Sequence, residues 1–266
     1  MTFKQQVLCL ILLSWHCSGL ADTLPKPIIK TLDTPPRVLF VGNSFSFYNN
    51  GIHNHYSALL RAANKWQTGK SYARLNTISG GALSEHVVSV PHLLQAADKP
   101  YDAVVLQGHS TEPVSQNKKA AFIQAVQQLD ASIKKAKART ILFMTWGYAG
   151  EAAMTEALAK AYIEAGNRIQ ALVVPVGLAF MQAQQQFPDI NLYVKDVLGV
   201  NQHGELTYRK EVKHPSSAGT YLAACVFYAS LQQASPLGLA FHADLDPETA
   251  AKLQDLAWQV TQAFFA

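Results

Sequence analysis

Short apolar runs of strand length alternate with segments of helical period along most of this chain. The runs are Val38 to Val41, Ala73 to Ile78, Ala103 to Leu106, Ile141 to Thr145 and Leu172 to Val176. A run that is apolar at nearly every position fits a strand buried on both faces, as in parallel sheets that helices cover. The alternation therefore predicts a three-layer α/β/α domain around a parallel sheet of five strands.

The intervening segments carry helix start and stop signals. Glu151 to Ala165 has helical character and is followed by Gly166, a residue that often ends helices. Asp246 and Pro247 are typical of the cap and first turn of a helix, which predicts a final helix from that point. Because ligands bind at the carboxyl ends of strands in such sheets, candidate functional residues are expected just after the strands.

The first 21 residues differ from the rest of the chain. Lys4 is followed by an apolar stretch from Val7 to Trp15 and by a small-residue exit that ends at Ala21. This pattern predicts a secretory signal peptide, residues 1–21, because the stretch is too short to span a bilayer. An uncleaved N-terminal anchor is the alternative. Residues 22–36 contain four prolines and are expected to form an extended arm that leads into one domain, residues 37–266.

Charge and cysteine content exclude several classes of protein. The 22 Lys and Arg residues exceed the 18 Asp and Glu residues by only four and form no long basic run, which argues against nucleic-acid binding. Removal of residues 1–21 would leave Cys225 as the one cysteine, so no intramolecular disulfide is expected. Cys225 lies in an apolar helical segment and is interpreted as a small buried residue, not a nucleophile. No stable membrane insertion is expected after signal cleavage.

Ser44 follows the first strand in the segment Gly42-Asn43-Ser44-Phe45-Ser46. A glycine permits a tight turn out of the strand, and a serine at the start of the next helix lies where helix N–H groups can meet an oxyanion. Ser44 is therefore a candidate nucleophile. The alternative is that it serves only as a helix N-cap.

His214 lies just before another predicted helix, and Glu211 precedes it by three residues. A histidine with a nearby carboxylate can act as a general base whose ring the acid orients. Ser44 and His214 are far apart in sequence, yet loops at adjacent strand ends can bring them together.

These segments resemble the sequence blocks of the SGNH hydrolases, also called GDSL-type esterases. The first block is similar to Gly42-Asn43-Ser44-Phe45, the second to Ser79-Gly80-Gly81, and the last to His214-Pro215-Ser216. The resemblance implies a flavodoxin-like fold, with Ser44 as nucleophile and His214 as general base. It also implies that the N–H of Ser44 and that of Gly80 or Gly81 donate to the oxyanion.

The sequence departs from the family pattern at two places. The third block is Gly-x-Asn-Asp in the family, with the asparagine as the third oxyanion donor, and here the strand ends in Gln107-Gly108-His109-Ser110. Gln107 is the expected donor and Ser110 the alternative. The family's Asp-x-x-His reads Glu211-x-x-His214, so the spacing favours Glu211 as the orienting acid. Asp196 is its rival, and the polar segment between Asp196 and His214 looks like an insertion. A backbone carbonyl could also orient the imidazole.

The resemblance implies a serine esterase that needs no metal and no organic cofactor. We expect a small-molecule or glycan ester as substrate, with a carbohydrate O-acetyl ester favoured because of the predicted export to the periplasm or outside the cell. A lipase or thioesterase, or a non-catalytic glycan-binding domain of the same fold, remain alternatives. His53 and His55 are interpreted as surface residues, not metal ligands. His86 and His109 are expected near the pocket without a catalytic role.

Overall fold

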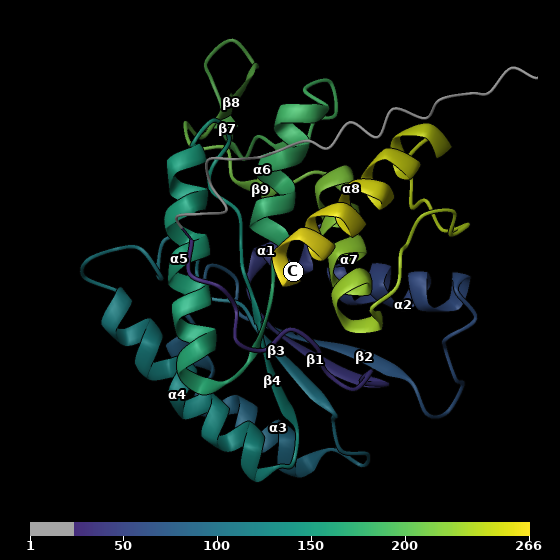
Figure 1. Ribbon diagram of the computed structural model, residues 1–266. Coiled ribbons are helices and arrows are strands. Elements are labelled where there is room, and N and C mark those ends of the chain that lie inside the picture. The colour runs from purple at the N-terminus through teal and green to yellow at the C-terminus, as the bar shows by residue number, and fades with distance from the viewer. Residues whose placement is uncertain (1–23) are drawn as a thin grey trace, which may run out of the picture.

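The computed structural model describes residues 24–266, which form a five-stranded parallel sheet covered by helices on both faces (Figure 1). The strand order is β2-β1-β3-β4-β5, the flavodoxin-like order. The strands are β1 (Arg37–Gly42), β2 (Tyr72–Thr77), β3 (Ala103–Leu106), β4 (Arg139–Phe143) and β5 (Leu172–Val174). The predicted fold class is confirmed. The signal peptide expected at residues 1–21 lies outside the described residues.

The helices divide between the two faces of the sheet because alternate strand residues point to opposite sides. Val38 and Phe40 of β1 pack into one buried cluster, and Leu39 and Val41 into the other. The first cluster includes side chains from α2 (Ile52–Ala62), α6 (Val176–Gln186), α7 (Ser217–Gln232) and α8 (Pro247–Phe265). The second includes side chains from the 3-10 turn η1 (Leu83–His86), α3 (Ser89–Ala96), α4 (Lys119–Lys135) and α5 (Ala152–Ile169).

The helix α5 runs three residues past the glycine that was expected to end it. Gly166 lies inside the helix because its missing side chain lets the helix approach β5: a Cβ there would lie 2.4 Å from Val173 Cγ2. The helix ends instead at Gln170, which adopts the left-handed conformation. The next strand is also shorter than expected, since Val176 already belongs to α6. The predicted start of α8 is confirmed, with the Asp246 carboxylate accepting a hydrogen bond from the Thr249 N–H.

The helix α7 is buried along nearly its whole length, between the sheet, α2 and α8 (Figure 1). Cys225 lies within it and is fully buried. Burial raises the pKa of its thiol, which keeps the thiol protonated and unreactive. The interpretation of Cys225 as a small packing residue is confirmed.

Two small antiparallel ladders lie outside the main sheet. The strand β6 (Tyr193–Val194) pairs with β9 (His214–Pro215), and between them β7 (Val197–Val200) pairs with β8 (Leu206–Tyr208). The β7–β8 hairpin forms the segment that was expected to be a polar insertion. It carries large exposed apolar side chains instead, at Val197, Leu198, Val200, Leu206 and Tyr208. No helix within residues 24–266 is both long and apolar enough to cross a bilayer.

Candidate active site

Ser44 is the first residue of the short helix α1 (Ser44–Phe47), which begins directly after β1. The residue that caps this helix is Asn43, whose side-chain oxygen accepts a hydrogen bond from the Phe45 N–H at 3.2 Å. The alternative in which Ser44 itself serves as the cap is therefore wrong. Because Asn43 caps the helix, the Ser44 hydroxyl takes no part in the cap.

Gln107 holds this turn from the end of the neighbouring strand β3. Its side-chain oxygen accepts hydrogen bonds from the Asn43 N–H and from the Ser46 hydroxyl, both at 2.9 Å. A backbone N–H can only donate, so the Gln107 side-chain atom that lies beside the Asn43 N–H must be the oxygen. This fixes the orientation of the Gln107 amide group. The nitrogen donates to the Asn43 side chain at 2.9 Å and to the Gly108 carbonyl. Gly42 makes room for these contacts, since a Cβ there would lie 2.2 Å from the Gln107 oxygen.

The expectation that Gln107 donates to the oxyanion is therefore corrected. Its side chain is almost fully buried, and both donor hydrogens are already used within the protein. Gln107 is a positioning residue, because it fixes the backbone that carries Ser44.

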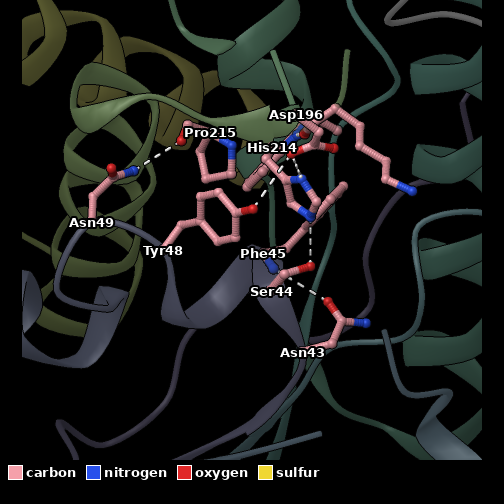
Figure 2. A network of polar contacts seen from close by, with 10 residues as sticks. Asn43, Ser44, Phe45, Tyr48, Asn49, Asp196, His214 and Pro215 are labelled. Carbon is pink, nitrogen blue, oxygen red and sulfur yellow. Dashed lines mark hydrogen bonds and ion pairs between the residues drawn. The ribbon is translucent and has the colours of Figure 1, made fainter. Parts of the chain in front are cut away.

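His214 reaches Ser44 from the β6–β9 ladder (Figure 2). Its Nε2 lies 2.8 Å from Ser44 Oγ, and its Nδ1 lies 2.6 Å from Asp196 Oδ1. The side chains of His214 and Asp196 are each 12% exposed. A neutral ring that donates its Nδ1–H to Asp196 presents a bare Nε2 to the serine, which is the arrangement a general base requires.

The carboxylate beside His214 belongs to Asp196, not to Glu211, so the expectation based on spacing was wrong. Val194 pairs with His214, and this places the chain just after Val194 beside the chain just before His214. The β7–β8 hairpin then leads the chain away and back, and the Arg209 N–H donates to the Asp196 carbonyl at 2.9 Å. Glu211 lies on the returning segment and is exposed.

Two aromatic rings hold the imidazole of His214 in place. Tyr48 stacks on it, with centroids 4.3 Å apart and an interplanar angle of 9°, and Phe45 meets it edge-on at 5.9 Å. The Tyr48 hydroxyl donates to Asp196 Oδ1 at 3.4 Å (Figure 2). Burial and the nearby charge of Asp196 raise the pKa of Tyr48, which keeps the phenol protonated as a donor. From the sequence, Tyr48 is one of several aromatic residues after the first strand that could either shape a substrate cleft or fill the core, and nothing in the pattern indicated its stacking on His214.

The two glycines after β2 differ in what their N–H groups can do. The Gly81 N–H donates to the Ile78 carbonyl at 3.0 Å, so it is not free for an oxyanion. Gly80 lies at the pocket with φ of 66°. Within residues 24–266, neither its N–H nor that of Ser44 has an acceptor. Of the expected pair, Gly80 is the one whose donor remains available.

His109 and Ser110 also line this pocket, which has a volume of about 460 Å³. Ser110 Oγ lies 3.1 Å from the Tyr148 hydroxyl. Burial lowers the pKa of His109, and the charges of Lys118 and Lys213 lower it further, so the ring is neutral at pH 7 and keeps one N–H. Its Nδ1 is buried without a hydrogen-bond partner among the described residues.

Two other histidines serve as hydrogen-bond donors within the fold. His86 is fully buried, and its Nε2 lies 3.0 Å from the Gly42 carbonyl oxygen at the end of β1. The Nε2 of His55 lies 2.8 Å from the Asn49 carbonyl oxygen. His55 is buried, not at the surface as expected, and within residues 24–266 no cluster of three potential metal ligands includes it.

No protein-family model matches the chain, and neither does any curated protein. Solved structures do match. A candidate SGNH hydrolase from Slackia heliotrinireducens is 25% identical, with a TM-score of 0.53, and the match covers 73% of this chain and 98% of that one. A DUF4886 family protein from Bacteroides uniformis is 18% identical, with a TM-score of 0.57 over 84% of this chain and 93% of that one. The protein TesA is 16% identical, with a TM-score of 0.51, and the match covers 74% of this chain and 98% of that one.

The last two matches show a likeness of fold alone. The chain therefore has the fold of the SGNH hydrolases, as its likeness to the candidate SGNH hydrolase shows.

Proposed function

We propose that this chain is a serine esterase that cleaves a carboxylic ester by acyl transfer through Ser44. The observation that carries the proposal is the continuous hydrogen-bonded line from Ser44 Oγ through both ring nitrogens of His214 to Asp196 (Figure 2). A serine, a histidine and a carboxylate connected in this order form a nucleophile with its base and the group that orients the base.

The reaction proceeds in two halves. Ser44 Oγ attacks the ester carbonyl carbon, and its proton moves to His214 Nε2 while Asp196 stabilises the resulting imidazolium. The tetrahedral intermediate collapses, and the alcohol leaves with the proton from Nε2. Water then attacks the acyl-serine, again giving its proton to His214, and the carboxylic acid is released as Ser44 recovers its proton.

The oxyanion would be stabilised by the N–H groups of Ser44 and Gly80, since both are free of acceptors in the described part of the chain. A third donor must come from a side chain that lines the pocket, because the donors of Gln107 are used elsewhere. We assign this role to His109, which lines the pocket and whose Nδ1 has no hydrogen-bond partner among the described residues; this departs from the expectation that His109 has no catalytic role. Ser110 is the weaker candidate because its hydroxyl already contacts Tyr148. Each such donor typically contributes a few kcal/mol.

The favoured substrate is an acetylated carbohydrate. A pocket of about 460 Å³ with Ser44 and His214 among its lining residues is large enough for a sugar ring and a small acyl group. The lipase and thioesterase alternatives require a longer acyl chain, and comparison of acetyl, long-acyl and thioester substrates separates these classes.

The decisive test is hydrolysis of p-nitrophenyl acetate by the chain without residues 1–21. We expect Ser44→Ala to lower kcat by at least a thousandfold with an unchanged circular dichroism spectrum, because the three residues act as a unit. Ser46→Ala, two positions away, is the matched control and should lose less than tenfold. If Ser46→Ala abolishes activity and Ser44→Ala does not, the nucleophile is misassigned. If the wild-type chain shows no turnover, the non-catalytic glycan-binding alternative is favoured.

We also propose that the protein is exported to the periplasm or outside the cell. The support is the sequence pattern of residues 1–21, with one cation, an apolar stretch and a small-residue exit. Mass spectrometry of the protein from its native host should find a chain that starts near Asp22. An intact Met1 on cytosolic protein would contradict the proposal.

A further inference from the structure

Two cationic side chains line the same pocket as Ser44. Arg209 and Lys213 lie on the segment that returns from the β7–β8 hairpin to His214. Within residues 24–266 neither forms a salt bridge with a carboxylate. The pocket-lining residues include one carboxylate, that of Asp196, whose Oδ1 lies 2.6 Å from His214 Nδ1 and whose negative charge offsets one of the two cations. With a neutral His214, the charged side chains that line the pocket therefore leave it a net positive charge.

The backbone beneath each cation is fixed. The Arg209 N–H donates to the Asp196 carbonyl at 2.9 Å. The Lys213 carbonyl accepts a hydrogen bond from the fully buried Trp146 Nε1 at 2.9 Å, and Trp146 in turn stacks on Phe45 at 4.5 Å. Both side chains thus start from positions tied to the catalytic segments.

The neighbouring residues of the same segment do not share this placement. Lys210 and Glu211 lie between Arg209 and Lys213 in sequence, and neither lines the pocket, although Lys210 is as exposed as Arg209. Lys195, between β6 and β7, does not line the pocket and lies 5.7 Å from the centre of the Tyr208 ring. Lys213 lies at a similar distance, 5.6 Å, from the centre of the Tyr148 ring. Of the four cations on this part of the chain, Arg209 and Lys213 line the pocket that holds Ser44, and Lys195 and Lys210 do not.

Among the charged groups that act on His109, the cations have the larger effect. The charge of Lys118 acts on His109 in the same sense as that of Lys213, and Glu85 opposes them weakly. A cleft with walls of low dielectric concentrates such a field on whatever enters it. Arginine binds carboxylates and other planar anions with two parallel hydrogen bonds, and lysine adds a mobile positive charge.

We infer that the pocket takes esters whose alcohol portion carries an anionic group, and that Arg209 and Lys213 bind this group while Ser44 attacks the acyl carbon. A carboxylated or sulfated sugar with an acetyl ester has this chemistry. The inference rests on the proposed esterase function and adds the charge of the substrate to it.

Two aryl acetates of equal size test the inference. One is 4-acetoxybenzoate, which carries a carboxylate, and the other is 4-acetoxybenzamide, which is neutral. For each enzyme variant, the measured quantity is the ratio of the two kcat/KM values. Division of the variant's ratio by the wild-type ratio removes the intrinsic reactivity of the two esters. A third ester, 4-acetoxybenzenesulfonate, distinguishes a preference for carboxylates from one for sulfate-like anions.

We expect Arg209→Gln and Lys213→Gln each to lower the ratio about threefold and the double variant to lower it about tenfold, mainly through KM for the anionic ester. Raising NaCl from 20 to 500 mM should lower the wild-type ratio, because salt screens partly exposed charges. The matched controls Lys210→Gln and Lys195→Gln should leave the ratio unchanged.

The outcomes separate the two proposals. Hydrolysis of the neutral ester that depends on Ser44, combined with a ratio that the double variant does not change, would overturn this inference and leave the esterase function intact. An equal loss in the Lys210→Gln control would also overturn it, because a general effect of surface charge would then suffice. If the wild-type chain hydrolyses no ester, calorimetric binding of 4-acetoxybenzoate to wild-type and double-variant protein decides the matter, and equal affinities contradict the inference.

Discussion

The nucleophile and the acid–base pair of the candidate active site are held in different ways. Ser44 follows a central strand, and the turn that carries it is fixed by the buried side chains of Asn43 and Gln107. His214 and Asp196 lie on a ladder of two short strands, from which an exposed hairpin projects. One half of the site is part of the core, and the other half is attached at its surface.

The contrast shows where the site can vary. A change in the nucleophile turn must leave buried polar groups satisfied, which is a strong constraint. The segment between Asp196 and His214 has accommodated a hairpin without loss of their contact, since the ladder of β6 and β9 fixes both ends of the insertion. Charges such as Arg209 and Lys213 can be introduced on this segment without cost to the core.

The largest expected effect concerns the surface-attached half. Asp196→Asn should lower kcat by about ten- to ten-thousandfold, because the amide no longer stabilises the imidazolium and can favour the wrong tautomer. Glu211→Gln, the matched control on the same segment, should change kcat less than twofold. Steady-state kinetics with p-nitrophenyl acetate measure both. The opposite result would mean that the contact between Asp196 and His214 does not operate in catalysis.

The second prediction concerns the third oxyanion donor, which lies between the two halves. His109→Ala should lower kcat about a hundred- to a thousandfold with a small change in KM, as for loss of other oxyanion donors. Ser110→Ala should cost less than tenfold. If Ser110→Ala has the larger effect, Ser110 is the donor and the role assigned to His109 is wrong.

The third prediction concerns the rigidity of the nucleophile half. Gln107→Leu keeps the approximate volume and leaves the buried Asn43 N–H without an acceptor, so the free energy of unfolding should fall by about 1–3 kcal/mol. Gln202→Leu, in the exposed hairpin, should change it by less than about 0.5 kcal/mol. Urea denaturation followed by fluorescence measures both. Equal effects would show that the two halves do not differ in rigidity.

The smallest effect is a pH dependence of stability that arises on the core side. Burial lowers the pKa of His86 in the folded state, so below about pH 6.5 the unfolded state takes up protons more readily and stability falls. The stability that neutral His86 contributes is fully present above about pH 6.5. Below that pH, one histidine can lower the free energy of unfolding by at most about 1.4 kcal/mol per pH unit. We expect Tm to fall between pH 7.5 and 5.0, and His86→Gln to flatten that slope. An identical slope in the variant would contradict this account.

Much of the fold and half of the site could be predicted from the sequence. The five parallel strands and the positions of Ser44 and His214 followed from local patterns and from motifs at the ends of strands, and the flavodoxin-like strand order followed from the resemblance to the SGNH hydrolases. The end of α5 could not be predicted from Gly166, because the close approach to Val173 is a tertiary contact. The sequence thus indicated where elements begin more reliably than where they end.

The sequence alone determined which residues could do chemistry, because an apolar run followed by Gly42-Asn43-Ser44 is a local signal. Only the tertiary structure decided which carboxylate meets His214 and what Gln107 does. The pairing of β6 with β9 brings Asp196 beside His214 across the inserted hairpin, and spacing along the chain does not report that pairing. Likewise, the Gln107 amide binds the nucleophile turn because two neighbouring parallel strands end side by side, which is a property of the sheet and not of either segment.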